Sequence, residues 1–318
     1  MICLSRLFTV VSAFFVLFVS SASVQATDLL YVTLSNNTIV RYNTTGTNGA
    51  TIAATVAVFA NSNLNVPVGL AFDSSGNLYA ANNLGNSISK FNSAGVYQSA
   101  GSIGSTNLNS PNGLAFDSSG NLYAANNFGN TISKFDSNGT LLATIGSGSN
   151  LSFPAGLAID PSGNLYAANN GSNTISKFDS NGTLLATIGT TNNLNGPVGL
   201  TLDSSNNLYV ANNGTSTIFK FNSAGVYQST GSIGSANLSS PFGLAIDSSG
   251  NLYAANYNNA TISKFDAAGN FLTSWSTGTS NFPLALAFQP TIVPEPSTYA
   301  LATIAVGVLS IIARRRRA

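Results

Sequence analysis

The sequence predicts an all-β chain that folds as a closed ring of six similar sheets, a six-bladed β-propeller. The first observation is a repeat: the segment PVGLAFD, which begins at Pro67, returns in similar form from Pro111, Pro154, Pro197 and Pro241, at intervals of 43 or 44 residues. A period in the low forties is typical of propeller blades, each built from four short strands. The second observation is that short apolar segments alternate with turns containing Asp and Gly, which favours strands over helices.

One repeat unit shows how the four strands follow each other. Strands are expected over residues 156–160, 164–168, 174–178 and 184–188, because these segments are short and rich in Leu, Ile, Tyr and Phe. The turns after the first and third strands begin with Asp160 and Asp179, and glycine occupies the fourth position of each. This order is typical of a type I turn followed by a residue with positive φ.

Both ends of the repeat region are needed to count the blades. Residues 30–31 and 38–43 match the second and third strands of a unit, with a connecting loop one residue shorter. The matching first strand is found at the other end, over residues 283–288. We therefore expect the last strand to complete the first blade, which closes the ring and removes open sheet edges. The propeller is expected to span residues 27–290.

The composition excludes several kinds of chemistry. Only 7% of the 318 residues are charged, histidine is absent, and the one cysteine is Cys3. Serine–histidine catalysis, cysteine–histidine catalysis and zinc sites of imidazole or thiolate ligands are therefore excluded. Residues 27–293 hold six basic and nine acidic side chains without a basic cluster, which argues against nucleic acid as a partner. We expect no catalytic residue, no bound metal and no cofactor.

The two ends have the composition of targeting segments. Residues 1–26 are typical of a cleavable signal peptide, because Arg6 precedes an apolar stretch and Val24-Gln25-Ala26 forms a small-residue cleavage site. At the other end, residues 291–298 form a linker, residues 299–313 an apolar segment expected to be a transmembrane helix, and residues 314–318 an arginine-rich cytoplasmic tail. An uncleaved N-terminal anchor and a plain single-pass C-terminal anchor are the alternatives.

The repeat pattern G-L-A-[FI]-D, N-L-Y-A-A-N-N and I-S-K-F-D resembles the NHL repeat over about residues 28–289. The resemblance implies the propeller fold but no single function, because propellers host lyases, lactonases, sensors and scaffolds. NHL-like lyases and virginiamycin-lyase-like propellers depend on histidine, so their chemistry is not expected here. The alternative function is a lactonase-like or strictosidine-synthase-like hydrolase or lyase with Ca²⁺ in the channel. It would need clustered carboxylates, and the only glutamate is Glu295.

The tail resembles the PEP-CTERM sorting signal, because V-P-E-P-S-T, a short apolar segment and an arginine run follow in that order. The resemblance implies that Pro294, Glu295 and Pro296 form the motif that an exosortase-type enzyme recognises. It also implies a Gram-negative bacterium that makes extracellular polysaccharide. The protein would be anchored transiently in the inner membrane and then reside at the cell surface or in the extracellular matrix.

Charged residues repeat once per blade. The same turn begins with an aspartate in five blades, at Asp73, Asp117, Asp160, Asp203 and Asp247. Each third strand carries one basic residue, at Arg41, Lys90, Lys134, Lys177, Lys220 and Lys264. We expect each carboxylate to cap the backbone amides of its own turn, and each basic side chain to make a regular contact, with an aspartate as its candidate partner. Calcium binding or catalysis by the aspartates and anion binding by the basic ring are the alternatives.

A binding site is expected where the blades differ, in the loops between second and third strands and at the openings of the blades, which share one face. The candidate residues are Asn83, Asn112, Asn127, Phe128, Asn170, Asn213, Phe242 and Tyr257. Amides beside aromatic rings suit an uncharged, polyhydroxylated ligand, because amides bond hydroxyls and rings cover sugar faces. The alternative is that the asparagines cap tight loops and the rings fill gaps.

Closely copied blades favour a scaffold over an enzyme. Residues 91–108 and 221–238 differ only at Ala100/Thr230 and Thr106/Ala236, so these blades have not diverged into separate catalytic roles. The sequence therefore predicts an exported, non-enzymatic surface or matrix protein that binds extracellular polysaccharide or a surface protein. A structural adhesin without a defined ligand is a further alternative.

Overall fold

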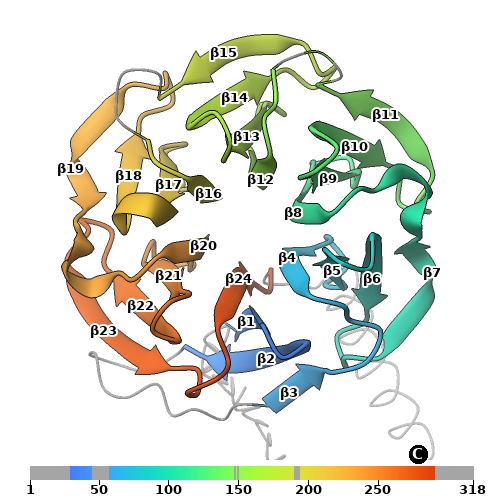
Figure 1. Cartoon of the computed structure of the whole chain (residues 1–318), viewed down its shortest axis with the longest axis horizontal. Helices are drawn as coiled ribbons and strands as arrows, with labels where there is room; N and C mark the ends of the chain where they lie inside the picture. Colours follow the sequence, from blue (N-terminus) through green and yellow to red (C-terminus); the bar gives the residue numbers. More distant parts are fainter. Residues whose placement is uncertain (1–28, 45–56, 147, 149, 190–193, 291–318) are drawn as a thin grey trace, which may run out of the picture.

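The computed structural model describes residues 29–44, 57–146, 148, 150–189 and 194–290, which form one ring of sheets (Figure 1). Six four-stranded antiparallel sheets surround a central axis, which confirms the predicted six-bladed propeller. The predicted signal peptide (1–26), linker (291–298), transmembrane helix (299–313) and arginine tail (314–318) lie outside the described residues. Within the described ranges, no helix has the length and hydropathy that crossing a bilayer requires.

Each blade runs from an inner strand at the axis to an outer strand at the rim, and the blades are numbered here along the chain. Blade 1 consists of β4 (Pro67–Phe72), β5 (Leu78–Asn82), β6 (Ser87–Phe91) and β7 (Tyr97–Ile103). Blade 2 consists of β8 (Pro111–Phe116), β9 (Leu122–Asn126), β10 (Thr131–Phe135) and β11 (Leu141–Ile145). Blade 3 consists of β12 (Pro154–Ile159), β13 (Leu165–Asn169), β14 (Thr174–Phe178) and β15 (Leu184–Ile188).

The remaining blades follow the same order. Blade 4 consists of β16 (Pro197–Leu202), β17 (Leu208–Asn212), β18 (Thr217–Phe221) and β19 (Tyr227–Ile233). Blade 5 consists of β20 (Pro241–Ile246), β21 (Leu252–Asn256), β22 (Thr261–Phe265) and β23 (Phe271–Ser276). Blade 6 combines β24 (Pro283–Phe288) with β1 (Leu29–Leu34), β2 (Thr38–Asn43) and β3 (Ala57–Ala60). Three short 3₁₀ turns lie in the loops: η1 (Ser105–Asn107), η2 (Asn213–Thr215) and η3 (Ser235–Asn237).

The ring is closed by the two ends of the described chain. Strand β24 pairs antiparallel with β1, with Leu30 opposite Phe288 and Val32 opposite Leu286. The backbone N–H of Gln289 donates to the carbonyl of Leu29 (3.1 Å). The prediction that the last strand completes the blade of the N-terminal strands, here blade 6, is confirmed, and the ring has no open seam.

The hydrophobic core lies in the seams between blades. In the seam of blades 2 and 3, Tyr123 and Ile132 of one blade pack with Leu157 and Phe178 of the next. The third strand of blades 1 to 5 ends with a phenylalanine that exposes 1% or less of its surface. Burying such a ring contributes about 1.5–3 kcal/mol relative to leaving it exposed, so the seams hold the ring together.

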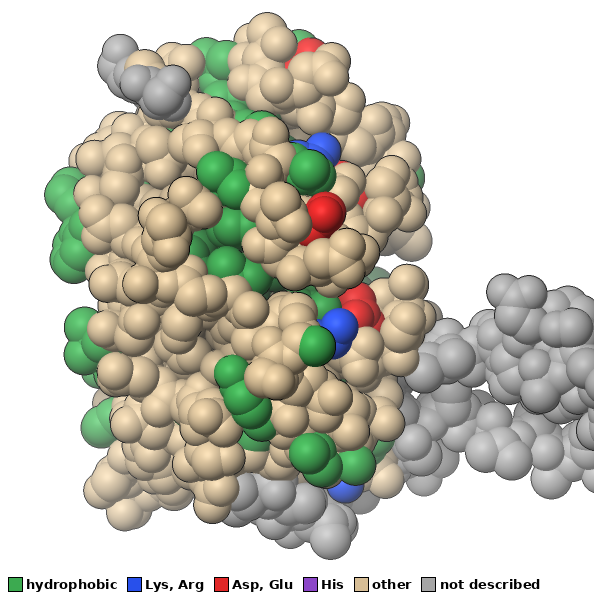
Figure 2. All heavy atoms as spheres, turned by 90° about the vertical axis from the view of Figure 1, so that its right-hand side faces the viewer, with side chains coloured by type: hydrophobic (Ala, Val, Ile, Leu, Met, Phe, Trp, Pro, Cys, Tyr) green, Lys and Arg blue, Asp and Glu red, His purple; other side chains and the backbone are tan. Residues whose placement is uncertain are grey.

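The propeller has two faces of different chemistry. The turn face holds the turns after first and third strands, such as Asp160–Gly163, in which the Gly163 N–H donates to the Asp160 carbonyl (2.8 Å) as a type I turn requires. The loop face holds the loops between second and third strands and the loops between blades. In Figure 2, charged side chains lie toward one side of the molecule and hydrophobic side chains protrude along the opposite edge.

The axis is packed too closely for most side chains. A Cβ added to Gly156 would lie 2.1 Å from the carbonyl oxygen of Val198 in the next blade, and one on Gly69 would lie 1.9 Å from that of Asn112. Glycine occupies this position of the inner strand in blades 1 to 5, and Ala285 occupies it in blade 6. The repeated glycine therefore allows the inner strands to approach backbone to backbone.

Candidate functional site

The turn face is a lattice of hydrogen bonds around its aspartates, as Asp160 illustrates. Its Oδ1 accepts the backbone N–H groups of Ser162 (3.0 Å) and Asn164 (2.9 Å). Its Oδ2 accepts the Asn164 side-chain amide (2.8 Å) and the Tyr166 hydroxyl (3.2 Å). The Lys177 Nζ lies 3.9 Å from this Oδ2 and 4.9 Å from the centre of the Tyr166 ring. The predicted role of the aspartates as turn caps is confirmed.

The same lysine–aspartate contact occurs in blades 1, 2, 4 and 5. The pairs are Lys90–Asp73 (3.9 Å), Lys134–Asp117 (3.4 Å), Lys220–Asp203 (3.7 Å) and Lys264–Asp247 (3.7 Å). Each of these lysines also lies over a tyrosine ring of its own blade, 4.9–5.2 Å from the ring centre. The basic residue of each third strand therefore contacts an aspartate in blades 1 to 5, as the sequence suggested.

The contacts around Asp117 and Asp160 favour the ionised form of these two carboxyl groups. Burial alone would raise the pKa of Asp117, but hydrogen bonds from Asn121 and the charge of Lys134 outweigh it and lower the pKa. The same balance lowers the pKa of Asp160. Burial alone would lower the pKa of Lys134, but its contacts with Tyr123 and Asp117 outweigh burial and raise the pKa. An ionised carboxylate with both oxygens engaged suits a structural role rather than proton transfer at neutral pH.

Blade 6 departs from this pattern. Gln289 stands where the other blades have aspartate and Arg41 where they have lysine, and the Tyr31 hydroxyl donates to Gln289 Oε1 (3.1 Å). In the described part of the chain, no group of three or more His, Cys, Asp or Glu side chains is placed to hold a metal ion. The carboxylate cluster that the calcium alternative needs is thus not found there.

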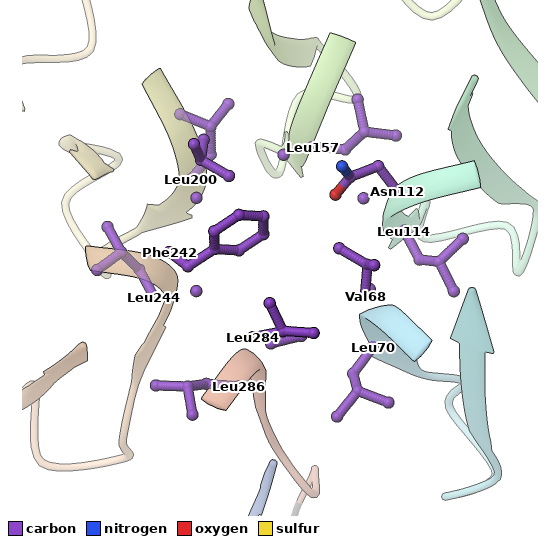
Figure 3. Close-up of a pocket in the computed structure, with 17 residues that line it drawn as sticks. Val68, Leu70, Asn112, Leu114, Leu157, Leu200, Phe242, Leu244, Leu284 and Leu286 are labelled. Atoms are coloured by element: carbon purple, nitrogen blue, oxygen red, sulfur yellow. The ribbon is translucent and has the colours of Figure 1, made fainter. Parts of the chain in front are cut away.

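The central channel is narrow and apolar. Its cavity of about 70 Å³ is lined at the loop-face mouth by Val68, Asn112, Phe242 and Leu284 and deeper by a ring of leucines such as Leu157. Figure 3 shows Phe242 projecting toward the middle of the channel, opposite Asn112. No lining residue is ionisable. The channel therefore offers neither a proton-transfer group nor a charged metal ligand.

The eight predicted ligand residues all lie on the loop face, but three of the asparagines are engaged with the neighbouring blade. The side-chain amides of Asn83, Asn127 and Asn213 point to the carbonyls of Pro111 (3.4 Å), Pro154 (3.2 Å) and Pro241 (3.5 Å). The side chains of Asn112 and Asn170 make no hydrogen bond with the described residues. These two amides are the free ones of the predicted set.

A second set of asparagines, which sequence reasoning did not single out, ties each blade to the inter-blade loop that precedes it. Each ends a second strand and is almost fully buried: Asn82, Asn126, Asn169, Asn212 and Asn256. Asn126 accepts the Asn109 N–H through Oδ1 (3.1 Å) and donates to Thr131 (3.1 Å) and Ser133 (2.9 Å). The available signal was their strict repetition at the end of each second strand, before a second Asn in blades 1 to 4 and before Tyr257 in blade 5, which marks a structural position.

Two aromatic groups lie on the loop face, and their exposed members are Phe128, Phe153 and Tyr257. Phe128, 63% exposed, and Phe153, 43% exposed, form an edge-to-face pair (centroids 6.2 Å apart) at the seam of blades 2 and 3. At the seam of blades 5 and 6, the ring of Tyr257 lies 5.3 Å from that of Phe282 and 6.4 Å from that of Phe242. We call them the aromatic pair and the aromatic triplet. Phe153 and Phe282 were not predicted, because both lie directly before a blade-opening proline, Pro154 and Pro283, and the prediction considered only the residue after it.

The described part of the loop face contains no charged residue. Its second-to-third-strand loops are 35–37, 83–86, 127–130, 170–173, 213–216 and 257–260, and the described parts of its inter-blade loops are 61–66, 104–110, 146, 148, 150–153, 189, 194–196, 234–240 and 277–282. None of these segments contains Asp, Glu, Lys or Arg. A further cavity of about 220 Å³ lies between η1 and β11 and is lined by Leu108 and neutral polar residues such as Thr106, Asn109, Thr131 and Thr144. This face therefore offers amides, hydroxyls and aromatic rings.

Comparison with sequence families identifies both parts of the chain. The NHL repeat family matches residues 151–178 and 194–221. The PEP-CTERM protein-sorting motif matches residues 293–317, which implies export, membrane-anchored sorting in a Gram-negative bacterium and processing by an exosortase-type enzyme. A search among curated proteins found no match.

Solved structures share the fold at low sequence identity. A chain of a nidogen/laminin complex is 23% identical (TM-score 0.70), with 84% of this chain and 99% of that chain covered. A streptogramin B lyase is 16% identical (TM-score 0.59), with 82% and 80% covered. A virginiamycin B lyase from Staphylococcus aureus, described as catalytically inactive after replacement of a histidine by alanine and bound to quinupristin, is 14% identical (TM-score 0.62), with 83% and 94% covered. The chain is a six-bladed β-propeller protein with NHL repeats and a PEP-CTERM sorting motif.

Proposed function

We propose that this exported propeller is a non-enzymatic binding module whose loop face binds an uncharged glycan. The observation that carries the proposal is the pairing of exposed aromatic rings with a face that has no charged side chain. Adjoining exposed rings form contiguous apolar surface, which is a feature of binding sites rather than of scattered surface side chains. Rings cover the apolar faces of sugars, and the free amides of Asn112 and Asn170 can bond hydroxyl groups.

The chemistry of the chain opposes an enzymatic role. It has no histidine, the residue type whose replacement accompanies inactivity in the solved virginiamycin B lyase variant. The aspartates of the five lattice turns are engaged on the turn face, and the channel lining has no ionisable group. A lactonase-like hydrolase with Ca²⁺ in the channel would need carboxylates there. The likeness to lyases concerns the fold, which hosts many functions.

The position of the chain ends supports presentation of the loop face. Leu29 and Gln289 lie at the turn-face ends of β1 and β24, so the sorting tail leaves from the face opposite the aromatic groups. The predicted linker 291–298 can span at most about 30 Å if fully extended. While the predicted tail holds the protein in the inner membrane, its attachment is to the turn face, which leaves the loop face free of the connection. After release, the protein would reside at the cell surface or in a polysaccharide matrix.

Binding of purified secreted protein to an array of neutral and acidic glycans tests the proposal. Phe128→Ser and Tyr257→Ser together should weaken binding to a neutral glycan at least about tenfold, because stacked aromatic side chains dominate such interfaces. Val96→Ser is the matched control, since Val96 is 56% exposed but lies on the turn face. Absence of neutral-glycan binding, or equal binding by the double variant, would contradict the proposal. Selective capture of a surface protein would favour the protein-ligand alternative.

The processing of the tail is tested separately by mass spectrometry of the secreted protein. Processing near Pro294, Glu295 and Pro296 removes the arginine run, so the mature chain should end close to this motif. Mature protein that still ends in Arg-Arg-Arg-Arg-Ala would contradict exosortase-type processing. That outcome would favour a plain membrane anchor and would leave the proposal for the loop face unaffected.

A further inference from the structure

The two aromatic groups lie on opposite sides of the channel mouth. The aromatic pair lies at the seam of blades 2 and 3 and the aromatic triplet at the seam of blades 5 and 6, which are three seams apart in a ring of six. Figure 1 shows these seams facing each other across the axis, between β8 and β12 on one side and between β20 and β24 on the other. The outer members of the two groups, Phe128 and Tyr257, therefore lie on opposite sides of the mouth.

Residues at the channel mouth connect the two groups into one line. Phe242 belongs to the triplet and also projects into the mouth, where Asn112 faces it from blade 2 (Figure 3). Blade 2 also carries Phe128 of the aromatic pair. A path across the face thus meets the aromatic pair, the free amide of Asn112, the ring of Phe242 and the rest of the triplet. The amide of Asn112 therefore lies between the two sets of rings along this path.

The loops beside this line are built from smaller residues. In blade 4 the loop has Gly214 and Thr215, and in blade 3 it has Gly171 and Ser172. Gly171 also makes room for the pair, because a Cβ there would lie 2.5 Å from the Phe153 ring. In blade 1 the exposed residue is aliphatic, Leu84. The aromatic rings therefore form a track across the face rather than a ring around it.

A ligand on this track must pass over the channel and not enter it. The cavity of about 70 Å³ is far smaller than the roughly 300–1,000 Å³ of ordinary ligand pockets. The inner strands approach one another closely at the glycine layer, and leucines line the channel below it. A single sugar could contact one aromatic group, whereas a chain of sugars can contact both.

We propose that the loop face binds a neutral polysaccharide as an extended chain laid across the channel mouth, with the aromatic pair and the aromatic triplet as two separate subsites. This inference rests on the proposed function and adds its ligand class, an internal stretch of a linear neutral polymer rather than a monosaccharide or a chain end. Two subsites on one ligand act as a bivalent site. The second contact then forms at high effective concentration, and affinity can rise by about 10²–10⁴ once the ligand spans both.

Titration calorimetry with size-graded oligosaccharides tests this arrangement. The probes are linear fragments of two to twelve sugars from neutral glucan, mannan and galactan, together with the parent polymers, titrated into the secreted protein. The affinity for the polymer that binds should rise steeply, at least about tenfold, at the length that spans both subsites and then level off. Fragments too short to span should bind at two sites per protein.

Single-subsite variants sharpen the result. Phe128→Ser and Tyr257→Ser should each leave one subsite intact. Each variant should therefore lose the steep rise in affinity and bind short fragments at one site. The double variant should bind neither the short fragments nor the long ones. Leu84→Ser is the matched control, because Leu84 is 66% exposed on the same face but belongs to neither group. Thermal unfolding of each variant shows that the propeller has folded.

The outcomes separate this inference from the proposed function. Binding of short fragments with no gain from length, or equal loss with Leu84→Ser, would overturn the bridging arrangement and leave glycan binding in place. Binding only through a chain end, seen as loss of affinity when the reducing and non-reducing ends are blocked, would also overturn it. No binding by any fragment or polymer would contradict both.

Discussion

Replacement of Gly156 by alanine tests how tightly the inner strands close the ring. The new Cβ would lie 2.1 Å from the Val198 carbonyl oxygen, 1.3 Å short of the 3.4 Å at which ordinary contact begins. The atoms it meets are backbone atoms of the next blade, so relief requires the seam of blades 3 and 4 to open. Overpacking of this kind costs about 1–3 kcal/mol, offset by up to about 1 kcal/mol from the reduced freedom of the unfolded chain. We expect a net loss of about 1–2 kcal/mol in the free energy of unfolding.

Urea unfolding of the secreted protein, followed through the fluorescence of its single tryptophan, measures this loss. Gly104→Ala is the control, because nothing lies within 4 Å of its added Cβ and its φ of −82° suits alanine. This control should be as stable as the natural chain or slightly more stable. Equal stability of Gly156→Ala and Gly104→Ala would refute the close approach of the inner strands.

Three further predictions concern the seams and the turn face. The Trp275 indole N–H is buried without a hydrogen-bond partner among the described residues, so Trp275→Phe should be nearly neutral in thermal unfolding. Trp275→Ala should cost about 2–3 kcal/mol, below the range for core aromatic residues, because the side chain is only partly buried. Equal losses would contradict this. Asp160→Ala should cost about 2–3 kcal/mol because four hydrogen bonds end on its carboxylate, while Asp179→Asn should be neutral, since Asn92 caps the same turn of blade 1. Stability should be constant between about pH 5 and 9, because the chain has no histidine. Stability should fall below about pH 4 as the carboxyl groups with lowered pKa, such as Asp160, are protonated. Stability should fall again above about pH 10. Burial raises the pKa of Tyr42 to about 12 in the folded protein, so at that pH the tyrosine ionises only in the unfolded chain. A decline near pH 6–7 would contradict this assignment.

The fold was predictable because its signals are local and repeated. The period of 43 or 44 residues, the Asp–Gly turns and the split first blade are all visible along the chain, and the β24–β1 pairing confirms what they imply. The turn-capping role of Asp160 could be predicted for the same reason, since its amide partners lie within four residues. Local hydrogen bonding follows from sequence position.

The functional site was only partly predictable because it depends on contacts between blades. The side chains of Asn83, Asn127 and Asn213 looked like ligand groups, but their amides point to the next blade, a relation set by blade geometry. The aromatic pair joins Phe128 to Phe153, and no periodic signal connects these two positions. The separation of charge between the two faces follows from strand direction, which places every second-to-third-strand loop on the uncharged side.

The salt dependence of glycan binding tests most directly whether an uncharged face recognises a neutral ligand. The dissociation constant for the neutral polysaccharide that binds most tightly should be measured for the secreted protein at 50 mM and 500 mM sodium chloride. Binding through rings and amides is barely screened by salt, so we expect the two constants to agree within about twofold. A loss of tenfold or more at the higher concentration would show that charged groups bind the ligand, and the loop face could not then be the site.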